Sequence, residues 1–213
     1  LLEELNSEIS RDICALSGPN LAKEIIQGEP SSTVVASDSL LTAQKVQSLI
    51  TSPKFRVYWS TDVAGVEFGG ALKNIIGIGA GICDGLGFGD NTKAAFITRG
   101  LAEIIRLGVA GGANSSTFSG LSGIGDLIAT CSSALSRNHF VGEQLVIGKN
   151  LGQIKSSMDN VAEGIDTTAA AFLLAKRLNV AMPITEAIYH VLFEDMGLDA
   201  ALERLLERPP SLE

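Results

Sequence analysis

The spacing of apolar and polar positions divides the chain into two parts. Up to about residue 60, short apolar runs at residues 13–17, 33–36 and 55–59 alternate with helix-like segments that begin near Leu21 and Leu41. Short runs rich in β-branched and aromatic residues are typical of strands, so this part predicts a βαβαβ-like order. Apolar side chains at helical spacing in residues 1–10 predict the end of an amphipathic helix in front of it.

After Asp62 no further strand is convincing, and apolar residues recur at helical spacing. Asp90 or Asn91 is the predicted cap of one helix, Ser136 caps another, and Pro183 opens a third. The sequence therefore predicts a mainly α protein in three parts: a strand-containing part at residues 1–61, an all-helical domain at residues 62–208, and a tail at residues 209–213 that resembles a vector scar.

The most apolar segment, residues 68–82, has two strongly polar residues near its middle, Lys73 and Asn74. It is short and glycine-rich for a membrane span, so we expect a buried helix that another backbone or a ligand approaches closely. A buried ammonium needs a partner, because an unpaired charge is costly there. Lys73 either pairs with a carboxylate or reaches solvent, or it donates and accepts protons near neutral pH beside an Asn74 that orients a substrate atom.

Two further polar groups stand at predicted helix starts. Asp126 and Thr130 are four residues apart, which places a carboxylate and a hydroxyl on one helix face. By itself this pair is better explained by the helix dipole and a hydroxyl bonded to its own backbone. Ser136, Arg137 and Asn138 combine a cap, a guanidinium and an amide, which suits a phosphate slightly better than it suits a solvated surface cap.

Two glycine-rich strings invite a nucleotide-binding interpretation that their context does not support. Residues 77–81 (GIGAG) and 85–89 (GLGFG) do not follow a strand with G-x-G-x-x-G spacing, so we interpret them as packing glycines or a turn. The turn at residues 18–20 (GPN) joins a strand to a helix, where backbone N–H groups can meet a ligand. Without other evidence, an ordinary turn is the better explanation of these residues.

Composition narrows the functional classes. A formal net charge of -8 argues against nonspecific nucleic-acid or anionic-membrane binding as a main task, so a phosphate site has to be a local cluster. The three cysteines are far apart in apolar surroundings, which predicts reduced, buried thiols of a cytosolic protein. With only His139 and His190, no metal-ligand spacing is present, and we predict no metal site.

Six motifs in a fixed order then point to a family. They are SGPNLAKEI at residues 17–25, GGALKNIIGIGAG at 69–81, DGLGFGDNTKAAFITRGLAE at 84–103, GIGDLIATC at 123–131, SRN at 136–138 and VAEG at 161–164. Together they closely resemble the bacterial type of NAD(P)-dependent glycerol-3-phosphate dehydrogenase, over about residues 13–206.

This resemblance implies a fold and an activity. The fold is a helical domain like that of 6-phosphogluconate dehydrogenase, preceded by the closing βαβαβ part of an NAD(P)-binding Rossmann-like domain. The activity is the reversible, NAD(P)H-dependent reduction of dihydroxyacetone phosphate to sn-glycerol 3-phosphate for glycerophospholipid synthesis. It also implies a cytoplasmic homodimer that takes a small phosphorylated substrate, binds no nucleic acid and does not insert into membranes.

The resemblance also implies roles for individual residues, with Lys73 as the catalytic acid/base. Positions that match substrate-contacting ones are Gly18, Asn20, Lys73, Asn74, Asp126, Thr130, Ser136, Arg137 and Asn138, the last three around the phosphate. Positions that match cofactor-contacting ones are Ala22, Arg137, Val161 and Glu163. Asn20 departs from the family, which usually has serine or threonine there.

The larger departure is at the front, because the chain lacks the G-x-G-x-x-G turn, which is the main NAD or NADP binding motif, and the second catalytic lysine of the family. We therefore expect this chain alone to bind nicotinamide cofactor poorly and to turn over slowly or not at all. Two alternatives stay open: a related hydroxy acid dehydrogenase with a Rossmann half and a helical half, and a non-enzymatic helical module for oligomerisation or binding.

Overall fold

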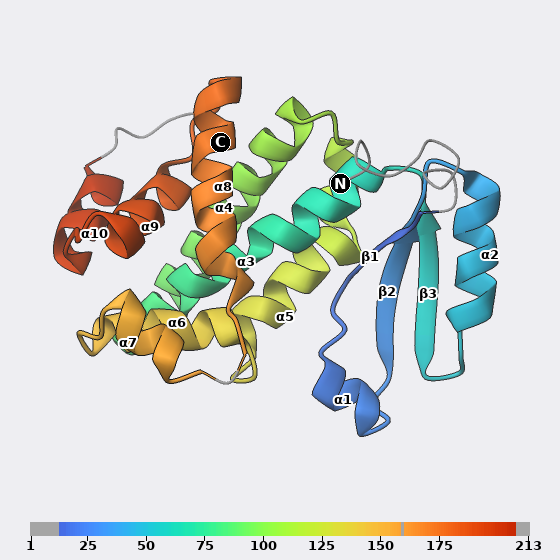
Figure 1. The fold of residues 1–213 in the computed structure, drawn as a ribbon, viewed down its shortest axis with the longest axis horizontal. Coiled ribbons are helices and arrows are strands. Elements are labelled where there is room, and N and C mark those ends of the chain that lie inside the picture. Colours follow the sequence, from blue (N-terminus) through green and yellow to red (C-terminus); the bar gives the residue numbers. More distant parts are fainter. Residues whose placement is uncertain (1–12, 159, 208–213) are drawn as a thin grey trace.

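The computed structural model describes residues 13–158 and 160–207 (Figure 1). Within these ranges, a three-stranded sheet and its helices lie at one end of a larger body of helices. The helix predicted at residues 1–10 and the tail at residues 209–213 lie outside the described residues. The mainly α fold with a helical second part is confirmed.

The sheet follows the predicted order of elements. Its bounds are β1 (Ala15–Ser17), α1 (Ala22–Ile26), β2 (Ser31–Ala36), α2 (Leu40–Ile50) and β3 (Phe55–Ser60). Strands β2 and β3 are parallel, with Val34 opposite Tyr58, whereas β1 pairs antiparallel with β2. The reason is α1, which has five residues, buries none of them and lies beyond the strand ends, so it does not cross the face of the sheet (Figure 1).

The helical body begins directly after β3. Its bounds are α3 (Val63–Gly85), α4 (Asp90–Ala110), η2 (Ser115–Ser119), η3 (Leu121–Gly125), α5 (Asp126–Ser132), α6 (Arg137–Val146), α7 (Leu151–Ser156), α8 (Glu163–Leu178), α9 (Pro183–Phe193) and α10 (Leu198–Leu206). Helix α3 runs through the centre and contacts β1, α4, α5, α6, α8 and α9 (Figure 1). It is the segment predicted from its apolar sequence to be a buried helix.

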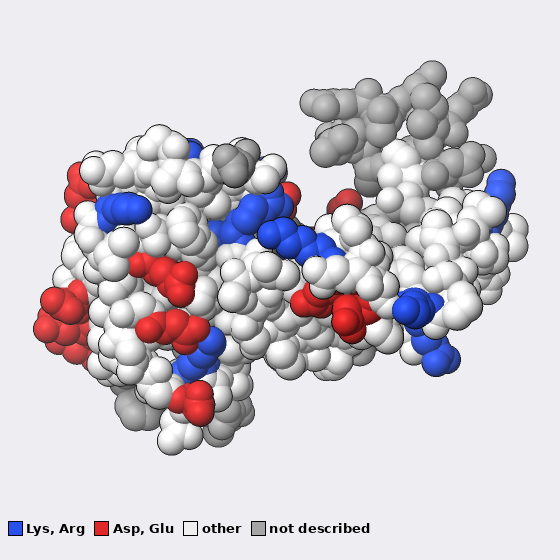
Figure 2. Space-filling view, turned by 90° about the horizontal axis from the view of Figure 1, so that it is seen from below, with Lys and Arg blue, Asp and Glu red and all other residues white. Residues whose placement is uncertain are grey.

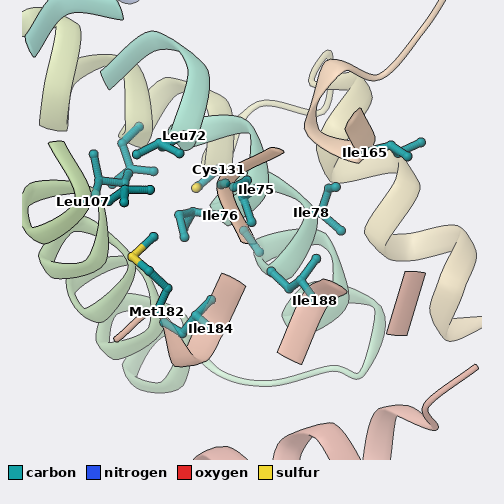
Figure 3. Packing of buried hydrophobic residues seen from close by; sticks show 14 of the residues in the cluster. Leu72, Ile75, Ile76, Ile78, Leu107, Cys131, Ile165, Met182, Ile184 and Ile188 are labelled. Carbon is teal, nitrogen blue, oxygen red and sulfur yellow. The ribbon is translucent and has the colours of Figure 1, made fainter. Parts of the chain in front are cut away.

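The core is built around α3. Ile75, Ile76 and Ile78 are at most 1% exposed, and α4 and α9 contribute Leu107 and Ile188 to the same cluster (Figure 3). Each such side chain contributes about 1.5–3 kcal/mol by leaving water. In the described ranges α3 is the one helix long and apolar enough to cross a membrane, and 67% of its most apolar window is buried. That burial fits the central helix of a globular core.

Glycines let other backbones approach α3, as predicted. A Cβ on Gly81 would lie 2.0 Å from the carbonyl oxygen of His139, and one on Gly142 would lie 2.1 Å from that of Ile78. Helices α3 and α6 therefore touch backbone to backbone, which brings the start of α6 against the middle of α3. In the second string, Gly87 has φ +73° and turns the chain after α3.

The predicted helix starts are confirmed in two cases and wrong in one. The Ser136 hydroxyl accepts from the backbone N–H of His139, and Pro183 is the first residue of α9. The cap of α4 is Gly89, without a side-chain hydrogen bond, and Asp90 is already the first helical residue. The prediction of Asp90 or Asn91 as a cap failed because a carboxylate is equally favourable in the first turn, where it meets the positive end of the helix dipole.

A buried carboxylate that the sequence did not reveal supports α9. Glu103 of α4 is 1% exposed and accepts from the backbone N–H groups of Ile184 at 2.6 Å and of Thr185 at 3.1 Å. It replaces a local cap, because Met182 forms none. Burial raises the pKa of Glu103 despite these hydrogen bonds.

The cysteines are free thiols, in agreement with the prediction. Cys83 and Cys131 are buried, and Cys14 is partly buried. Burial raises the pKa of Cys131 to about 12, so this thiol stays protonated at neutral pH.

Asp62 stands where the chain passes from β3 into the helical body. Its carboxylate caps α3 through the N–H of Gly65 at 3.0 Å, and it also accepts from the N–H of Asn114 at 2.9 Å and the hydroxyl of Thr117 at 2.5 Å. Burial acts to raise the pKa of Asp62, but the hydrogen bonds from Thr117, Gly65 and Asn114 outweigh it and hold the pKa below its ordinary value.

Replacing Asp62 with alanine should lower the free energy of unfolding by about 1–2 kcal/mol at pH 7, because three donors lose their acceptor. The folded-state pKa lies below the unfolded one, so this stabilisation is present above the unfolded pKa and is lost as pH falls through the folded value. Urea unfolding should therefore show the gap between Asp62→Ala and the parent shrinking below about pH 4. Asp90→Ala, at a carboxylate without a cap bond, is the control with a smaller loss. A gap that is constant from pH 7 to pH 3 would contradict this account.

Candidate active site

A cavity of about 620 Å³ lies between the sheet and the helical body. Its walls come from β1 and the turn after it, from the first half of α3, from α5, and from the starts of α6 and α8. Figure 2 shows basic side chains gathered along the junction of these two parts, whereas acidic side chains are prominent on the helical end. The local positive cluster predicted for an acidic protein is therefore compatible with this surface.

Lys73 and Asp126 form an ion pair on the cavity wall. The Lys73 ammonium donates to the Asp126 carboxylate, and the two side chains are 17% and 5% exposed. This is the carboxylate partner that the apolar surroundings of Lys73 required. The ammonium still faces the cavity, so its ion pair with Asp126 is compatible with a role in proton transfer.

The turn after β1 holds the other side of Asp126. The Ser17 hydroxyl donates to this carboxylate at 3.3 Å, and the backbone N–H of Gly18 also donates to it. Burial raises the pKa of Asp126 above its ordinary value, and the attraction of Lys73 and the hydrogen bonds offset this only in part. This carboxylate is therefore bonded from both the sheet part and the helical part.

Gly18 is required at this turn. It has φ +152°, and a Cβ there would lie 2.9 Å from the Cα atom of Thr33 on the neighbouring strand. The Asn20 amide donates to the Thr33 hydroxyl at 3.2 Å, which donates in turn to the Ser17 carbonyl at 3.0 Å. These contacts hold the turn against β2 and keep Ser17 and Gly18 aimed at Asp126.

A second polar group crosses three helices. The Asn138 side chain donates to the Asn74 Oδ1 atom at 2.9 Å and accepts from the Gly164 N–H at 2.9 Å. Asn74 and Asn138 are 6% and 8% exposed, and both lie on the cavity wall. Their side chains join α3, α6 and the first turn of α8.

The start of α6, for which the sequence suggested an anion site, lies on the cavity wall. Ser136 caps the helix, and the exposed Arg137 has no hydrogen-bond or ion-pair partner among the described residues. Asp126 and Thr130 share one face of α5 and line the cavity, as their spacing predicted. Over residues 13–158 and 160–207 the Thr130 hydroxyl has no partner, so the predicted bond to its own backbone is absent.

The cavity brings together most of the predicted site residues but not all of them. Those on its wall are Asn20, Lys73, Asn74, Asp126, Thr130, Ser136, Arg137, Asn138 and Glu163. Gly18 reaches the site through its backbone, whereas Ala22 and Val161 lie outside the wall. Sequence reasoning gave Ser17 no role, although it stands first in the SGPN motif. No cluster of potential metal ligands occurs in the described ranges.

Comparison with known proteins decides the family. The family description "NAD-dependent glycerol-3-phosphate dehydrogenase C-terminus" matches residues 62–203, and its N-terminal counterpart matches residues 1–43. The chain belongs to the NAD-dependent glycerol-3-phosphate dehydrogenase family. The resemblance in the sequence motifs is thereby confirmed.

Relatives named glycerol-3-phosphate dehydrogenase [NAD(P)+] are identical to the chain at about half of the aligned positions. That of Dehalococcoides mccartyi strain 195 is 55% identical over 97% of this chain and 57% of its own length. That of Bacillus subtilis strain 168 is 51% identical over 96% of this chain and 59% of its own length. The chain thus spans less than two thirds of these relatives.

Solved glycerol-3-phosphate dehydrogenases have the same fold. The crystal structure from Coxiella burnetii superposes with a TM-score of 0.88 at 36% identity, over 92% of this chain and 60% of that one. The enzyme of Saccharomyces cerevisiae superposes with a TM-score of 0.80 at 29% identity, over 91% and 59%. The fold of this chain is therefore matched over about nine tenths of its length.

The ion pair makes a prediction for stability. Lys73→Met leaves Asp126 buried without its counter-ion, and we expect a loss of about 3 kcal/mol in the free energy of unfolding at pH 7. The pKa of Asp126 is raised in the folded state, so folding favours the protonated carboxyl group. The free-energy cost of burying its negative charge therefore grows as pH rises through the folded-state pKa. The loss should therefore shrink toward pH 4, in urea titrations at both pH values.

The double variant Lys73→Met/Asp126→Asn removes both charges and should recover at least half of that loss, because an amide oxygen still accepts from Ser17 and Gly18. Lys93→Met breaks the ion pair with Asp84, whose side chain is 33% exposed, and should cost less. A double variant no more stable than Lys73→Met would show that the two charges are not coupled.

Proposed function

We propose that the protein to which this chain belongs reduces dihydroxyacetone phosphate to sn-glycerol 3-phosphate with NADH or NADPH, reversibly. The supporting observation is the Lys73–Asp126 ion pair on the wall of a cavity that also holds Arg137, which starts a helix and has no partner among the described residues. A proton donor at one place and an anion site at another suit a small substrate with a carbonyl and a phosphate. The proposed role of the helical domain, residues 62–208, is to hold that substrate.

Each residue then has a task set by its contacts. Lys73 donates a proton to the carbonyl oxygen as the carbon is reduced, and the buried Asp126 keeps the ammonium aimed at the cavity. Arg137 and the N–H groups of the α6 start hold the phosphate, with the Thr130 hydroxyl as a further donor. Proton transfer to oxygen leaves an alcohol in place of the ketone.

The residues present fit only part of a nicotinamide site. When bound, the reduced cofactor supplies the hydride that the carbonyl carbon accepts and is itself oxidised. Leu16 and Leu135 line the cavity at 48% and 44% exposure, an apolar surface that suits a flat ring. The chain lacks the G-x-G-x-x-G turn that cradles a dinucleotide phosphate, so Ala22, Arg137, Val161 and Glu163 are proposed to add contacts to a cofactor held mainly elsewhere.

Two further properties are part of this proposal. The homodimer and the cytoplasmic location that the resemblance implies stay predictions, and size-exclusion chromatography with light scattering tests the first of them. Glycerophospholipid synthesis would then be the consumer of the product.

Turnover tests the acid/base. A family-length protein, in which this chain continues the N-terminal segment of the Dehalococcoides mccartyi relative, should oxidise NADH or NADPH when dihydroxyacetone phosphate is added. Lys73→Ala should lower kcat by about 100-fold or more, because the carbonyl oxygen loses its proton donor. Lys149→Ala, a lysine bonded to Gln144 outside the cavity, should keep the parent rate.

The chain alone serves as a second control and should show little or no NADH oxidation. A folded family-length protein that is inert with both cofactors would overturn the proposed function. Activity with a three-carbon hydroxy acid in its place would favour the related dehydrogenase considered above.

Arg137 makes a separate prediction about the phosphate. In the family-length protein, Arg137→Ala should raise KM for dihydroxyacetone phosphate by roughly 10- to 100-fold, the effect of losing hydrogen bonds to a charged group. At saturating cofactor the loss should be smaller with unphosphorylated dihydroxyacetone, since this substrate has no anion to bind. Arg177→Ala, an exposed arginine of α8, is the matched control. An equal loss with both substrates would remove Arg137 from the phosphate site.

A further inference from the structure

The orientation of two buried amides is determined by one backbone N–H group. The Gly164 nitrogen can only donate, so the atom of Asn138 that lies 2.9 Å from it has to be the oxygen. The Asn138 nitrogen then lies on the other side of the amide, 2.9 Å from Asn74. This orientation does not depend on an assumed position of any side-chain hydrogen, because a backbone N–H group can only donate.

The same reasoning carries one residue further. Asn74 faces a donor on Asn138 and therefore has to present its Oδ1 atom there. Its Nδ2 group points the other way, where its one protein contact among the described residues is the Gly70 carbonyl at a long 3.4 Å. Gly70, Asn74 and Lys73 all line the cavity. One amide hydrogen of Asn74 thus donates to Gly70, and the other has no acceptor among the described residues and is left for a ligand.

We propose that Asn138 is a positioning residue that holds the Asn74 Nδ2 group toward the cavity, where it donates to the substrate oxygen that Lys73 protonates. This inference rests on the proposed function and deepens it. The oxygen gains negative charge as the carbon is reduced, so a second donor stabilises it. The pair of donors selects a carbonyl or hydroxyl oxygen and disfavours an amine at that carbon.

The atoms around Gly164 are packed too closely for a side chain at this position. A Cβ at this position would lie 2.6 Å from the Asn138 oxygen and 2.7 Å from the Asn74 carbonyl oxygen. The first turn of α8 can approach both amides because the residue is glycine. With 6% and 8% exposure, neither amide can turn to water for another partner.

Two substitutions of Asn138 distinguish a role in positioning Asn74 from a merely structural role. Asn138→Asp keeps an acceptor for Gly164 but presents a second oxygen to Asn74, so Asn74 has to turn its Nδ2 group away from the cavity. Asn138→Ala leaves Asn74 free to take either orientation. In the family-length protein we expect kcat for dihydroxyacetone phosphate to fall about 100-fold in Asn138→Asp and less in Asn138→Ala. A merely structural role predicts the reverse order, because aspartate preserves the bond to α8.

Charge repulsion of the phosphate is a second explanation for a defect in Asn138→Asp, and the substrate separates the two. Unphosphorylated dihydroxyacetone has no anion, so repulsion predicts that its turnover is normal in this variant. Positioning predicts that the defect in kcat persists. Normal turnover of dihydroxyacetone by Asn138→Asp, or a milder defect than in Asn138→Ala, would overturn the inference.

A binding measurement keeps the inference separate from the activity. In the family-length protein, the side-chain amide signals of Asn74, assigned by their loss in Asn74→Asp, should shift in nitrogen–proton spectra when glycerol 3-phosphate is added. They should not shift in Asn138→Asp at saturating ligand. An inert protein that shows this pattern would refute the proposed function and retain the orientation of Asn74. Shifts that are the same in both proteins would refute the orientation.

Discussion

The ion pair between Lys73 and Asp126 is the contact on which the arrangement of the site depends. It joins the central helix α3 to α5, and through Ser17 and Gly18 the same carboxylate holds the turn after β1. Two parts of the chain with different secondary structure therefore share one buried charge. A buried carboxylate without its partners would lower the stability of the fold. This carboxylate therefore favours one arrangement of the sheet part against the helical body.

Close backbone packing is the second condition of the site. Gly81 and Gly142 let α3 and α6 touch, and Gly164 lets α8 reach Asn74 and Asn138. These close contacts fix the helices α3, α6 and α8, which carry much of the cavity wall, at short distances from one another. Such rigidity favours chemistry that needs donors in fixed positions, since little reorganisation is left to the moment of reaction.

The proposed function divides between the residues of this chain, which line the substrate cavity, and the rest of the whole protein. The described residues line one cavity with an ion pair, amides and an arginine, whereas the sequence contains no G-x-G-x-x-G turn of the kind that holds a dinucleotide. Under the proposed function, the helical domain is the part that holds and protonates the substrate. Cofactor binding and hydride delivery belong to the proposed whole protein.

Prediction from the sequence was strongest where the signal was local. The three strands and the starts of α1, α2, α6 and α9 lie close to their predicted positions, the Ser136 cap is confirmed, and Asp126 and Thr130 share a face, since periodicity and capping depend on near neighbours. The short elements η2, η3 and α7 were not predicted. The antiparallel pairing of β1 and the carboxylate cap from Glu103 were not predictable in this way, because each depends on residues far away in the chain.

By itself, the sequence determined that Lys73 needs a partner, that the molecule is mainly helical, and which family its motifs resemble. Only the tertiary structure decided that the partner is Asp126, that Ser17 supports it, and which way the Asn74 amide faces. The physical reason is that a buried polar group needs a hydrogen-bond or ion-pair partner, which the local sequence can indicate. Which group becomes the partner depends on which distant segments of the backbone pack closely enough.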